Sequence, residues 1–147
     1  MHCRFIDTKS WSRLRGLFAE DVRFEGFGSA PSGANLDAVL AGVSTRLADA
    51  ISVHHCHTPE LMFSSAITAR GIWAMADYVE WPVGTSCREA PGSRGFRGFG
   101  HYEEEYRKID TVWVFSFLRL TRLRIDPLRE DDPVPLAGAR QATPDWV

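Results

Sequence analysis

The period of the hydrophobic pattern changes near residue 51 of this chain. Before that point apolar residues recur every three or four positions, and after it they alternate with polar residues over long stretches. The first spacing is typical of amphipathic helices and the second of half-buried strands. Because the helical segments come first and the strands follow as a block, the pattern predicts an α+β domain whose helices pack on one face of an antiparallel sheet.

Two helices are expected in the first part of the chain. One follows Ser10, a possible cap, and ends near Ala19; its apolar positions are Trp11, Leu14, Leu17 and Phe18. Residues 22–27 then alternate as a short strand. The second helix follows Asn35, a residue type that caps helix N-termini, and its apolar positions are Leu36, Val39, Leu40, Val43 and Leu47.

The second part of the chain predicts a strongly curved sheet. The expected strands are residues 52–57, 60–63, 68–81, 98–108 and 112–126, with a loop rich in Gly and Pro at 82–97 and a tight turn at 108–111. Several of these stretches exceed the usual length of a flat strand, so we expect them to be bent or bulged. The folded domain is expected to span residues 1–126. Residues 127–147 are proline-rich without periodicity, which predicts an irregular, partly disordered tail.

Composition narrows the class of partner. The chain has 147 residues, 44% of them hydrophobic, which is enough for one sizeable core. Seventeen basic and nineteen acidic residues give a net charge of -2, so neither a nucleic acid nor an anionic membrane surface is an expected partner. No stretch approaches the ~18 apolar residues of a membrane helix, and the N-terminus lacks a signal-peptide pattern. We therefore expect a cytoplasmic protein that binds a small, neutral or weakly polar molecule.

The three cysteines, Cys3, Cys56 and Cys87, are odd in number, far apart in the sequence and form no CxxC pair. This spacing argues against a disulfide framework and against a structural zinc site. A reducing compartment is the expected setting.

Groups that can move protons near neutral pH gather in two segments. Residues 52–60 and 98–106 hold four of the five histidines and a run of three glutamates. In the second segment Phe99, His101, Glu103 and Glu105 share one face of the strand, and Gly100, Tyr102, Glu104 and Tyr106 share the other. We expect His101 to face inward, with Tyr102 as the second candidate. The chain carries no GxSxG, P-loop or dinucleotide-binding motif.

A metal site is the alternative for the first segment. His55 and His57 would share a strand face, with Glu60 close behind, as in the HxH-plus-Glu arrangement of cupins. The spacing to Glu60 is short by at least one residue, and no second motif supplies a further histidine. We therefore expect no metal centre, with an open carboxylate and histidine set as the alternative.

Five segments together resemble a known family. Residues 7–22 pair an acid with a helix that ends in Leu17-Phe18 and a further acid, and the other four segments follow in the family's order and spacing: 52–60, 68–75, 100–108 and 120–126. In these segments the chain is similar to the SnoaL-like branch of the NTF2-like superfamily. The family's Asp-Gly turn is replaced here by Asp110-Thr111.

The resemblance implies an α+β cone, in which a strongly bent sheet and helices enclose a deep apolar pocket. The family includes scytalone dehydratase, ketosteroid isomerases and polyketide cyclases, which act by acid/base chemistry without a cofactor, and also non-catalytic binding proteins. Asp7 and His54 match the positions of an acid and a histidine that line the dehydratase pocket. The dehydratase's second histidine would fall at Phe99, two residues before His101.

These arguments give the following expectations. The catalytic residues are Asp7, His54, His101 and Tyr102; the substrate-binding residues are His55, Trp73, Met75, Asp77, Phe99 and Arg122; no metal is expected. Asp77 alternates with apolar neighbours along its strand, so it is expected to be a pocket acid that can take part in proton transfer. The expected function is that of a lyase, isomerase or cyclase acting on a polyketide-, steroid- or terpenoid-like molecule. The alternative is a non-catalytic ligand-binding or dimeric interaction domain, and a homodimer is expected in either case.

Overall fold

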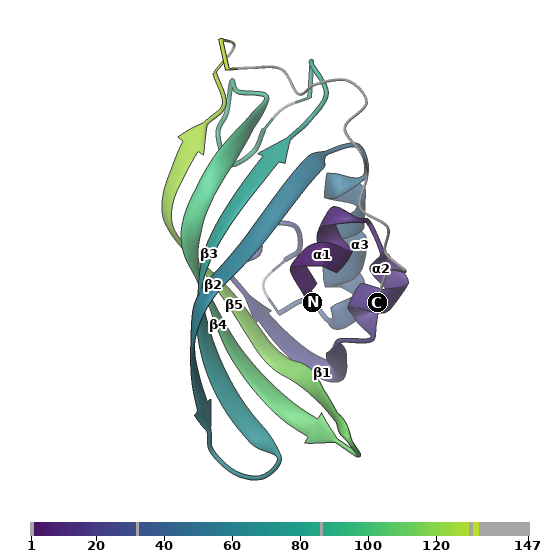
Figure 1. Ribbon diagram of the computed structural model, residues 1–147. Helices are drawn as coiled ribbons and strands as arrows, with labels where there is room; N and C mark the ends of the chain where they lie inside the picture. Colours follow the sequence, from purple (N-terminus) through teal and green to yellow (C-terminus); the bar gives the residue numbers. More distant parts are fainter. Residues whose placement is uncertain (1, 32, 86, 130, 133–147) are drawn as a thin grey trace.

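The computed structural model describes residues 2–31, 33–85, 87–129 and 131–132. Within these residues the chain forms three helices and five strands (Figure 1). Their order is α1 (His2–Asp7), α2 (Trp11–Arg15), β1 (Phe18–Glu25), α3 (Leu36–Leu47), β2 (Ile51–Phe63), β3 (Thr68–Glu80), β4 (Gly95–Ile109) and β5 (Val112–Pro127).

The strands form one open sheet in the order β1-β5-β4-β3-β2. Strands β2 to β5 pair antiparallel with their neighbours, whereas β1 pairs with β5 in parallel. The sheet is therefore mixed, and the expectation of a wholly antiparallel sheet is wrong at this edge. The rest of the domain lies between β1 and β5 in sequence, so no hairpin joins them. Without a hairpin the two strands are free to pair in parallel.

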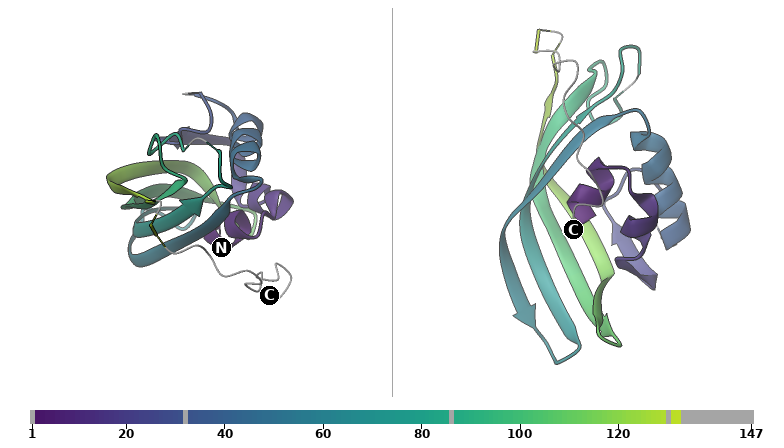
Figure 2. Two further views of the ribbon diagram at one scale, coloured as in Figure 1. Left: turned by 90° about the horizontal axis from the view of Figure 1, so that it is seen from above. Right: turned by 45° about the vertical axis from the view of Figure 1, so that its right-hand side comes forward.

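The helices all lie against one face of the bent sheet, which is its concave face (Figures 1 and 2). This arrangement confirms the α+β cone with its N-terminal helices on a strongly curved sheet. The other face of the sheet carries no helix among the described residues.

The first helical segment is shorter than the sequence predicts. Helix α2 ends at Arg15, and β1 already begins at Phe18, so a helix that continues to Ala19 is wrong. The backbone N–H of Phe115 on β5 donates a hydrogen bond to the Leu17 carbonyl at 2.9 Å. Leu17 and Phe18 keep the apolar spacing of a helix, but their backbone pairs with the sheet, and local periodicity does not register that long-range pairing.

Bulges bend the long strands as expected. The pairing register of β2 and β3 shifts between His57 and Glu60, so the two predicted strands 52–57 and 60–63 are one strand with a bulge. The pairing of β4 with β5 shifts twice, between Phe99 and Gly100 and between Glu105 and Tyr106. Each extra residue kinks its strand and increases the local twist, which curves the sheet around the helices.

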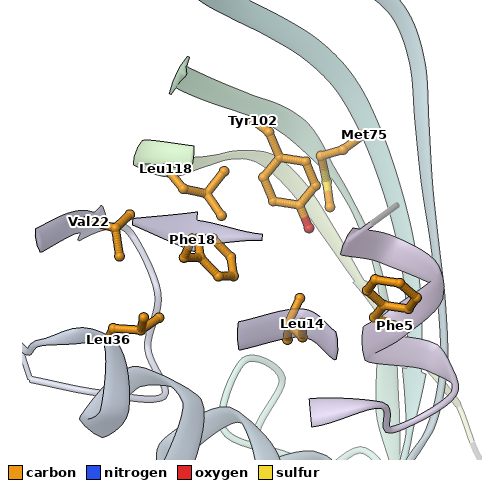
Figure 3. Close-up of a cluster of buried hydrophobic side chains, with 8 residues drawn as sticks. All are labelled: Phe5, Leu14, Phe18, Val22, Leu36, Met75, Tyr102 and Leu118. Atoms are coloured by element: carbon orange, nitrogen blue, oxygen red, sulfur yellow. The ribbon is translucent and has the colours of Figure 1, made fainter. Parts of the chain in front are cut away.

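The main core lies between the helices and the concave face (Figure 3). Its buried members come from α1, α2, α3 and four of the strands: Phe5, Leu14, Phe18, Val22, Leu36, Met75, Tyr102 and Leu118. A second cluster packs around Val79, Trp81 and Phe96. Fully burying one such side chain contributes about 1.5–3 kcal/mol, so the two clusters fix the helices on the sheet.

The last strand and the residue after it lie at the end of the described fold. Strand β5 continues to Pro127, and Leu128 is 2% exposed, with its backbone N–H donating to the Gly95 carbonyl at 2.9 Å. Residues 133–147 lie outside the described residues, so an irregular tail there stays a prediction. None of the helices in the described part of the chain is long and apolar enough to cross a membrane.

Asn35 caps α3 as the sequence predicts, since its side-chain oxygen accepts the Ala38 N–H at 2.9 Å. Replacing Asn35 with Ala removes this acceptor and should lower the free energy of unfolding by about 1 kcal/mol, measured by urea denaturation. Asn35→Asp keeps an acceptor at the same place, so its free energy of unfolding should stay within a few tenths of a kcal/mol of the wild-type value. Equal losses in both variants would show that the cap contributes nothing.

Candidate active site

Helix α1 ends in an acid that binds the second strand. The Asp7 Oδ1 atom lies 2.7 Å from His54 Nδ1, and its Oδ2 atom accepts the backbone N–H of His54 at 2.8 Å. The Ser52 hydroxyl also donates to Oδ1, at 3.0 Å. Because a carboxylate only accepts hydrogen bonds, Nδ1 carries the ring proton and Nε2 is the nitrogen that can take another.

A second carboxylate lies on the other side of the imidazole. The Asp77 Oδ2 atom is 3.9 Å from His54 Nε2, and the Asp77 side chain is 2% exposed. Arg122 neutralises it with two parallel hydrogen bonds, Nη1 to Oδ1 at 2.6 Å and Nη2 to Oδ2 at 2.5 Å. This fork geometry fixes the relative orientation of the carboxylate and the guanidinium.

A glycine on β4 makes room for this ion pair. Asp77 lies on β3 and Arg122 on β5, so the Arg122 side chain must cross the concave face of β4 between them. A Cβ atom at Gly98 would collide with both the Arg122 guanidinium and the Asp77 carboxylate. At Gly100 it would collide with the backbone carbonyl of Thr121. The absence of a side chain at Gly98 therefore opens the path that the guanidinium occupies, and the absence of one at Gly100 lets the β5 backbone approach β4.

These groups line one cavity of about 320 Å³ between α3 and the sheet. Its polar lining includes His54, Asp77, Arg122 and Tyr102. Its walls are largely apolar, formed by Ile6, Phe27, Val43, Leu47, Val79, Trp81, Phe96, Leu120 and Ile125. An apolar cavity with a few convergent polar groups is the usual form of a small-molecule site.

Tyr102 is 3% exposed, and burial raises the pKa of its hydroxyl well above the usual value. The hydroxyl therefore stays protonated and can act as a hydrogen-bond donor. Figure 3 shows it pointing from the sheet towards the helices.

Several of the predicted site residues lie in or beside the cavity. Asp77 and Arg122 line the cavity with His54 and Tyr102, and Asp7 holds the far side of the imidazole. Met75 is 3% exposed and lies beneath Arg122. Trp73 lies further along the same face of β3 and donates its indole N–H to the Tyr106 hydroxyl at 2.9 Å.

The predicted inward orientation of His101 is wrong, and two predicted substrate-binding residues, Phe99 and His55, do not line the cavity. His101 and Phe99 lie on the outer face of β4, because Tyr102 and Glu104, each 3% exposed, occupy the concave face and neighbouring residues alternate. His55 is exposed on the outer side of β2 for the same reason, since His54 faces inward. Strand alternation predicts which residues share a face, but which face is buried depends on where the helices pack.

The His55, His57 and Glu60 set is not brought together as a metal site. The rings of His55 and His57 lie 5.7 Å apart on the outer face, and a bulge separates them from Glu60. Among the described residues, the potential ligands within 4.8 Å of one another are instead His2, Cys3 and Cys56.

Two of the three cysteines are far apart in the sequence but meet in the fold, because the Sγ atoms of Cys3 and Cys56 are 3.2 Å apart. Both thiols are free. One signal could have revealed the pair: Cys3 precedes Asp7 by four residues and Cys56 follows His54 by two, so docking Asp7 on His54 brings the cysteines together.

Three further functional residues were missed from the sequence: Ser52, Lys9 and Gly98. The Lys9 ammonium donates to the Ser52 hydroxyl at 3.1 Å, which extends the hydrogen-bond chain behind Asp7. Burial lowers the pKa of Lys9, and the Asp7 carboxylate partly offsets this. Ser52 could have been found from its position two residues before His54, on the same strand face.

Comparisons with known proteins agree with this fold. A sequence profile of the SnoaL-like domain matches residues 1–119. A search of the curated proteins finds no significant match.

Solved structures with the same fold are similar over most of their length. A hexachlorocyclohexane dehydrochlorinase, LinA-type3 from Novosphingobium barchaimii, is 21% identical, with 91% of this chain and 87% of that one covered and a TM-score of 0.70. A putative scytalone dehydratase from Novosphingobium aromaticivorans is 18% identical, with 99% and 87% covered and a TM-score of 0.68. A putative calcium/calmodulin-dependent protein kinase II association domain from Xanthomonas campestris is 11% identical, with 83% and 80% covered and a TM-score of 0.66. At these identities the likeness establishes the fold alone.

Gly98→Ala tests the path of the guanidinium. The added methyl group displaces the Asp77–Arg122 pair and should cost about 1–3 kcal/mol of unfolding free energy, as overpacking does in a filled site. Gly16→Ala is the matched control, because Gly16 is helical and an added Cβ would meet the Arg13 carbonyl at an ordinary 3.5 Å. Urea denaturation measures both. Unchanged stability of Gly98→Ala would mean that the pair has another way to fit.

Proposed function

The chain belongs to the SnoaL-like domain family, and on that premise we propose that it is a small-molecule lyase, isomerase or cyclase. In this proposal, side chains of the protein remove a proton from the bound molecule and return it without the help of a cofactor. The observation that carries it is the 2.7 Å contact between Asp7 Oδ1 and His54 Nδ1, with the imidazole lining an apolar cavity. A carboxylate that fixes the tautomer of an imidazole and stabilises its protonated form makes that imidazole an effective base.

The proposed first step removes a proton from a carbon of the bound molecule. His54 Nε2 takes the proton, and Asp7 stabilises the imidazolium that forms. The electron pair of the broken C–H bond forms a new C=C bond and expels a leaving group from the neighbouring carbon, which is an elimination. In an isomerisation the same pair delocalises onto a carbonyl oxygen instead, and the proton returns at another carbon.

Arg122 and Tyr102 are placed to receive the negative charge that develops. Both line the cavity with His54. Both can donate a hydrogen bond to an anionic leaving group or to an enolate oxygen. Asp77 is proposed as a positioning residue, because its two hydrogen bonds hold the guanidinium plane. Its charge also stabilises an imidazolium across the 3.9 Å that separates it from Nε2.

The cavity walls indicate the substrate class. Their largely apolar character favours a ring compound with few polar substituents. Two structural neighbours are named as a dehydrochlorinase and a putative dehydratase, and both names denote elimination next to a C–H bond. A polyketide-, steroid- or terpenoid-like ring is the proposed substrate.

A non-catalytic ligand-binding or interaction domain is the second candidate. One neighbour of the same fold is named as a putative association domain. In addition, the Asp77 carboxylate already satisfies Arg122, which lowers the attraction of the cavity for an anion. In this alternative the Asp7–His54 pair serves to hold α1 on β2.

A homodimer through the outer sheet face is part of both candidates. Four apolar side chains on that face are 40–69% exposed: Val53, Ile72, Phe99 and Leu123. Pairing two such faces would remove this apolar surface from water. Light scattering should give twice the chain mass, and a monomer at micromolar concentration contradicts the proposal.

His54→Gln and Asp7→Asn test the acid/base proposal. The panel consists of hexachlorocyclohexane, scytalone and a β,γ-unsaturated ketosteroid, followed by chloride release, dehydration and enone formation respectively. Wild type should turn over at least one of them. His54→Gln should lower that rate at least ~100-fold, because it removes the base. Asp7→Asn should also lower the rate, since the amide cannot stabilise the imidazolium.

His101→Gln is the matched control, because it changes the same residue type on the outer face of the sheet and should leave the rate unchanged. Circular dichroism of all three variants shows whether the fold persists. A rate that survives His54→Gln rejects the mechanism. Saturable binding of a panel member without turnover, unaffected by His54→Gln, favours the binding domain.

A further inference from the structure

Helix α1 and strand β2 meet through two matched pairs of side chains. Cys3 and Asp7 are four residues apart on α1 and so share one face of the helix. His54 and Cys56 are two residues apart on β2 and so share its concave face. The first pair of contacts is Asp7 with His54 at 2.7 Å, and the second is Cys3 with Cys56, whose Sγ atoms are 3.2 Å apart. The proposed proton-transfer chemistry uses only the first pair.

A third group converges on the two thiols. His2 Nε2 lies 3.6 Å from Cys3 Sγ, and the His2 residue is 6% exposed. The His2 imidazole packs edge-to-face against two aromatic rings. Its ring centroid lies 5.1 Å from that of Tyr102 and 5.5 Å from that of Phe115. The three potential ligand atoms all lie within 4.8 Å of one another. The imidazole is therefore positioned before any ligand arrives.

We propose that His2, Cys3 and Cys56 bind a thiophilic divalent cation, with Zn²⁺ as the biological candidate, and that the cation clamps α1 to β2. Two thiolates and one imidazole form a ligand set that zinc accepts, with a fourth position left for a carboxylate or water. This proposal does not rest on the proposed function, because none of the three ligands has a part in that chemistry.

The spacing of the ligand atoms suits a tetrahedral ion. Zn–S bonds of about 2.3 Å and Zn–N bonds of about 2.0 Å place two sulfurs about 3.8 Å apart and a sulfur and a nitrogen about 3.5 Å apart in a tetrahedron. The His2 to Cys3 distance of 3.6 Å already agrees. The Cys3 to Cys56 distance of 3.2 Å must open by about 0.6 Å, which a side-chain rotation achieves without moving the backbone.

A buried carboxylate without a complete set of partners lies in the same place. Glu104 is 3% exposed, and its Oε1 atom has no hydrogen-bond partner among the described residues, while Oε2 accepts the Tyr106 hydroxyl. Glu104 lines the same hollow as the three proposed ligands. Burying an unpaired carboxylate oxygen is costly, and a cation bound directly or through its water would remove that cost.

The Glu104 oxygen and the His2 ring also favour a bound cation over a simple disulfide. A disulfide between Cys3 and Cys56 would use the thiols but would leave both of these groups without a role. A cation uses all four. We therefore assign the cluster to metal binding and treat oxidation of the thiols as the competing result.

The test titrates Zn²⁺ into the full chain, purified without a histidine tag, stripped of metal and held under a non-thiol reductant. Competition with a chromophoric chelator measures affinity and stoichiometry, and the expected result is one equivalent per chain. Co²⁺ in place of Zn²⁺ should give the near-ultraviolet charge-transfer absorption of thiolate ligation. Saturating Zn²⁺ should also raise the melting temperature, because the cation binds the folded state.

Variants identify the ligands. Cys3→Ser and Cys56→Ser should each abolish stoichiometric binding and the charge-transfer band, and His2→Ala should weaken binding at least ~10-fold, as loss of a zinc ligand or its support does. Glu104→Gln should weaken it less. Cys87→Ser is the matched control and should bind as wild type, since Cys87 is fully buried in the second cluster, with Val79 and Trp81.

Two results would overturn the assignment. The first is a folded, reduced wild type that takes up no stoichiometric Zn²⁺, and the second is uptake that persists in Cys3→Ser and Cys56→Ser. Thiol titration distinguishes the competing result. If the denatured, untreated protein has one reactive thiol and reductant restores three, Cys3 and Cys56 form a disulfide. If the reduced protein then binds no metal, the cluster is a disulfide-forming pair and not a metal site.

Discussion

The attachment of α1 to β2 through the Asp7 carboxylate is the interaction on which the candidate site depends. Both of its oxygens are used, by the His54 ring, the His54 backbone and the Ser52 hydroxyl. One half-buried side chain therefore fixes the end of a short helix, the position of a strand and the tautomer of an imidazole. A helix of six residues is too short to be stable alone, so these contacts and the packing of Phe5 must hold it.

The curvature of the sheet gives this attachment its chemical use. Bulges in β2 and β5 bend the strands around the helices, and the cavity is lined by residues of both apolar clusters. His54 is at the wall of that cavity because β2 runs along the edge of the sheet nearest α1. A flat sheet packed on the same helices would close the space with side chains, as ordinary interiors do.

The sequence predicts most of this fold and about half of the site, and the division has a physical basis. Local signals succeed where local interactions decide: Asn35 caps its helix, and the alternating strands exist where their period indicates. They fail at Leu17 and Phe18, whose backbone bonds to a strand almost a hundred residues away in sequence. They also fail at His101, because alternation cannot tell the inner face of β4 from the outer one. Asp7 and His54 were predicted through the family resemblance, whereas Gly98 and the cysteine pair depend on cross-strand and helix-strand contacts.

The Asp77–Arg122 pair bears on what kind of chemistry the cavity can support. A lone carboxylate beside His54 Nε2 would compete with the substrate for the imidazole, and a lone guanidinium would oppose its protonation. Because two hydrogen bonds pair the groups, their opposite charges nearly cancel at a distance. Each group still keeps polar atoms near the cavity. The site can then hold an uncharged molecule before reaction and still offer a donor when negative charge appears on a leaving group. This arrangement favours a neutral substrate that becomes charged only during the reaction, and Gly98 is the position in β4 whose missing side chain makes it possible.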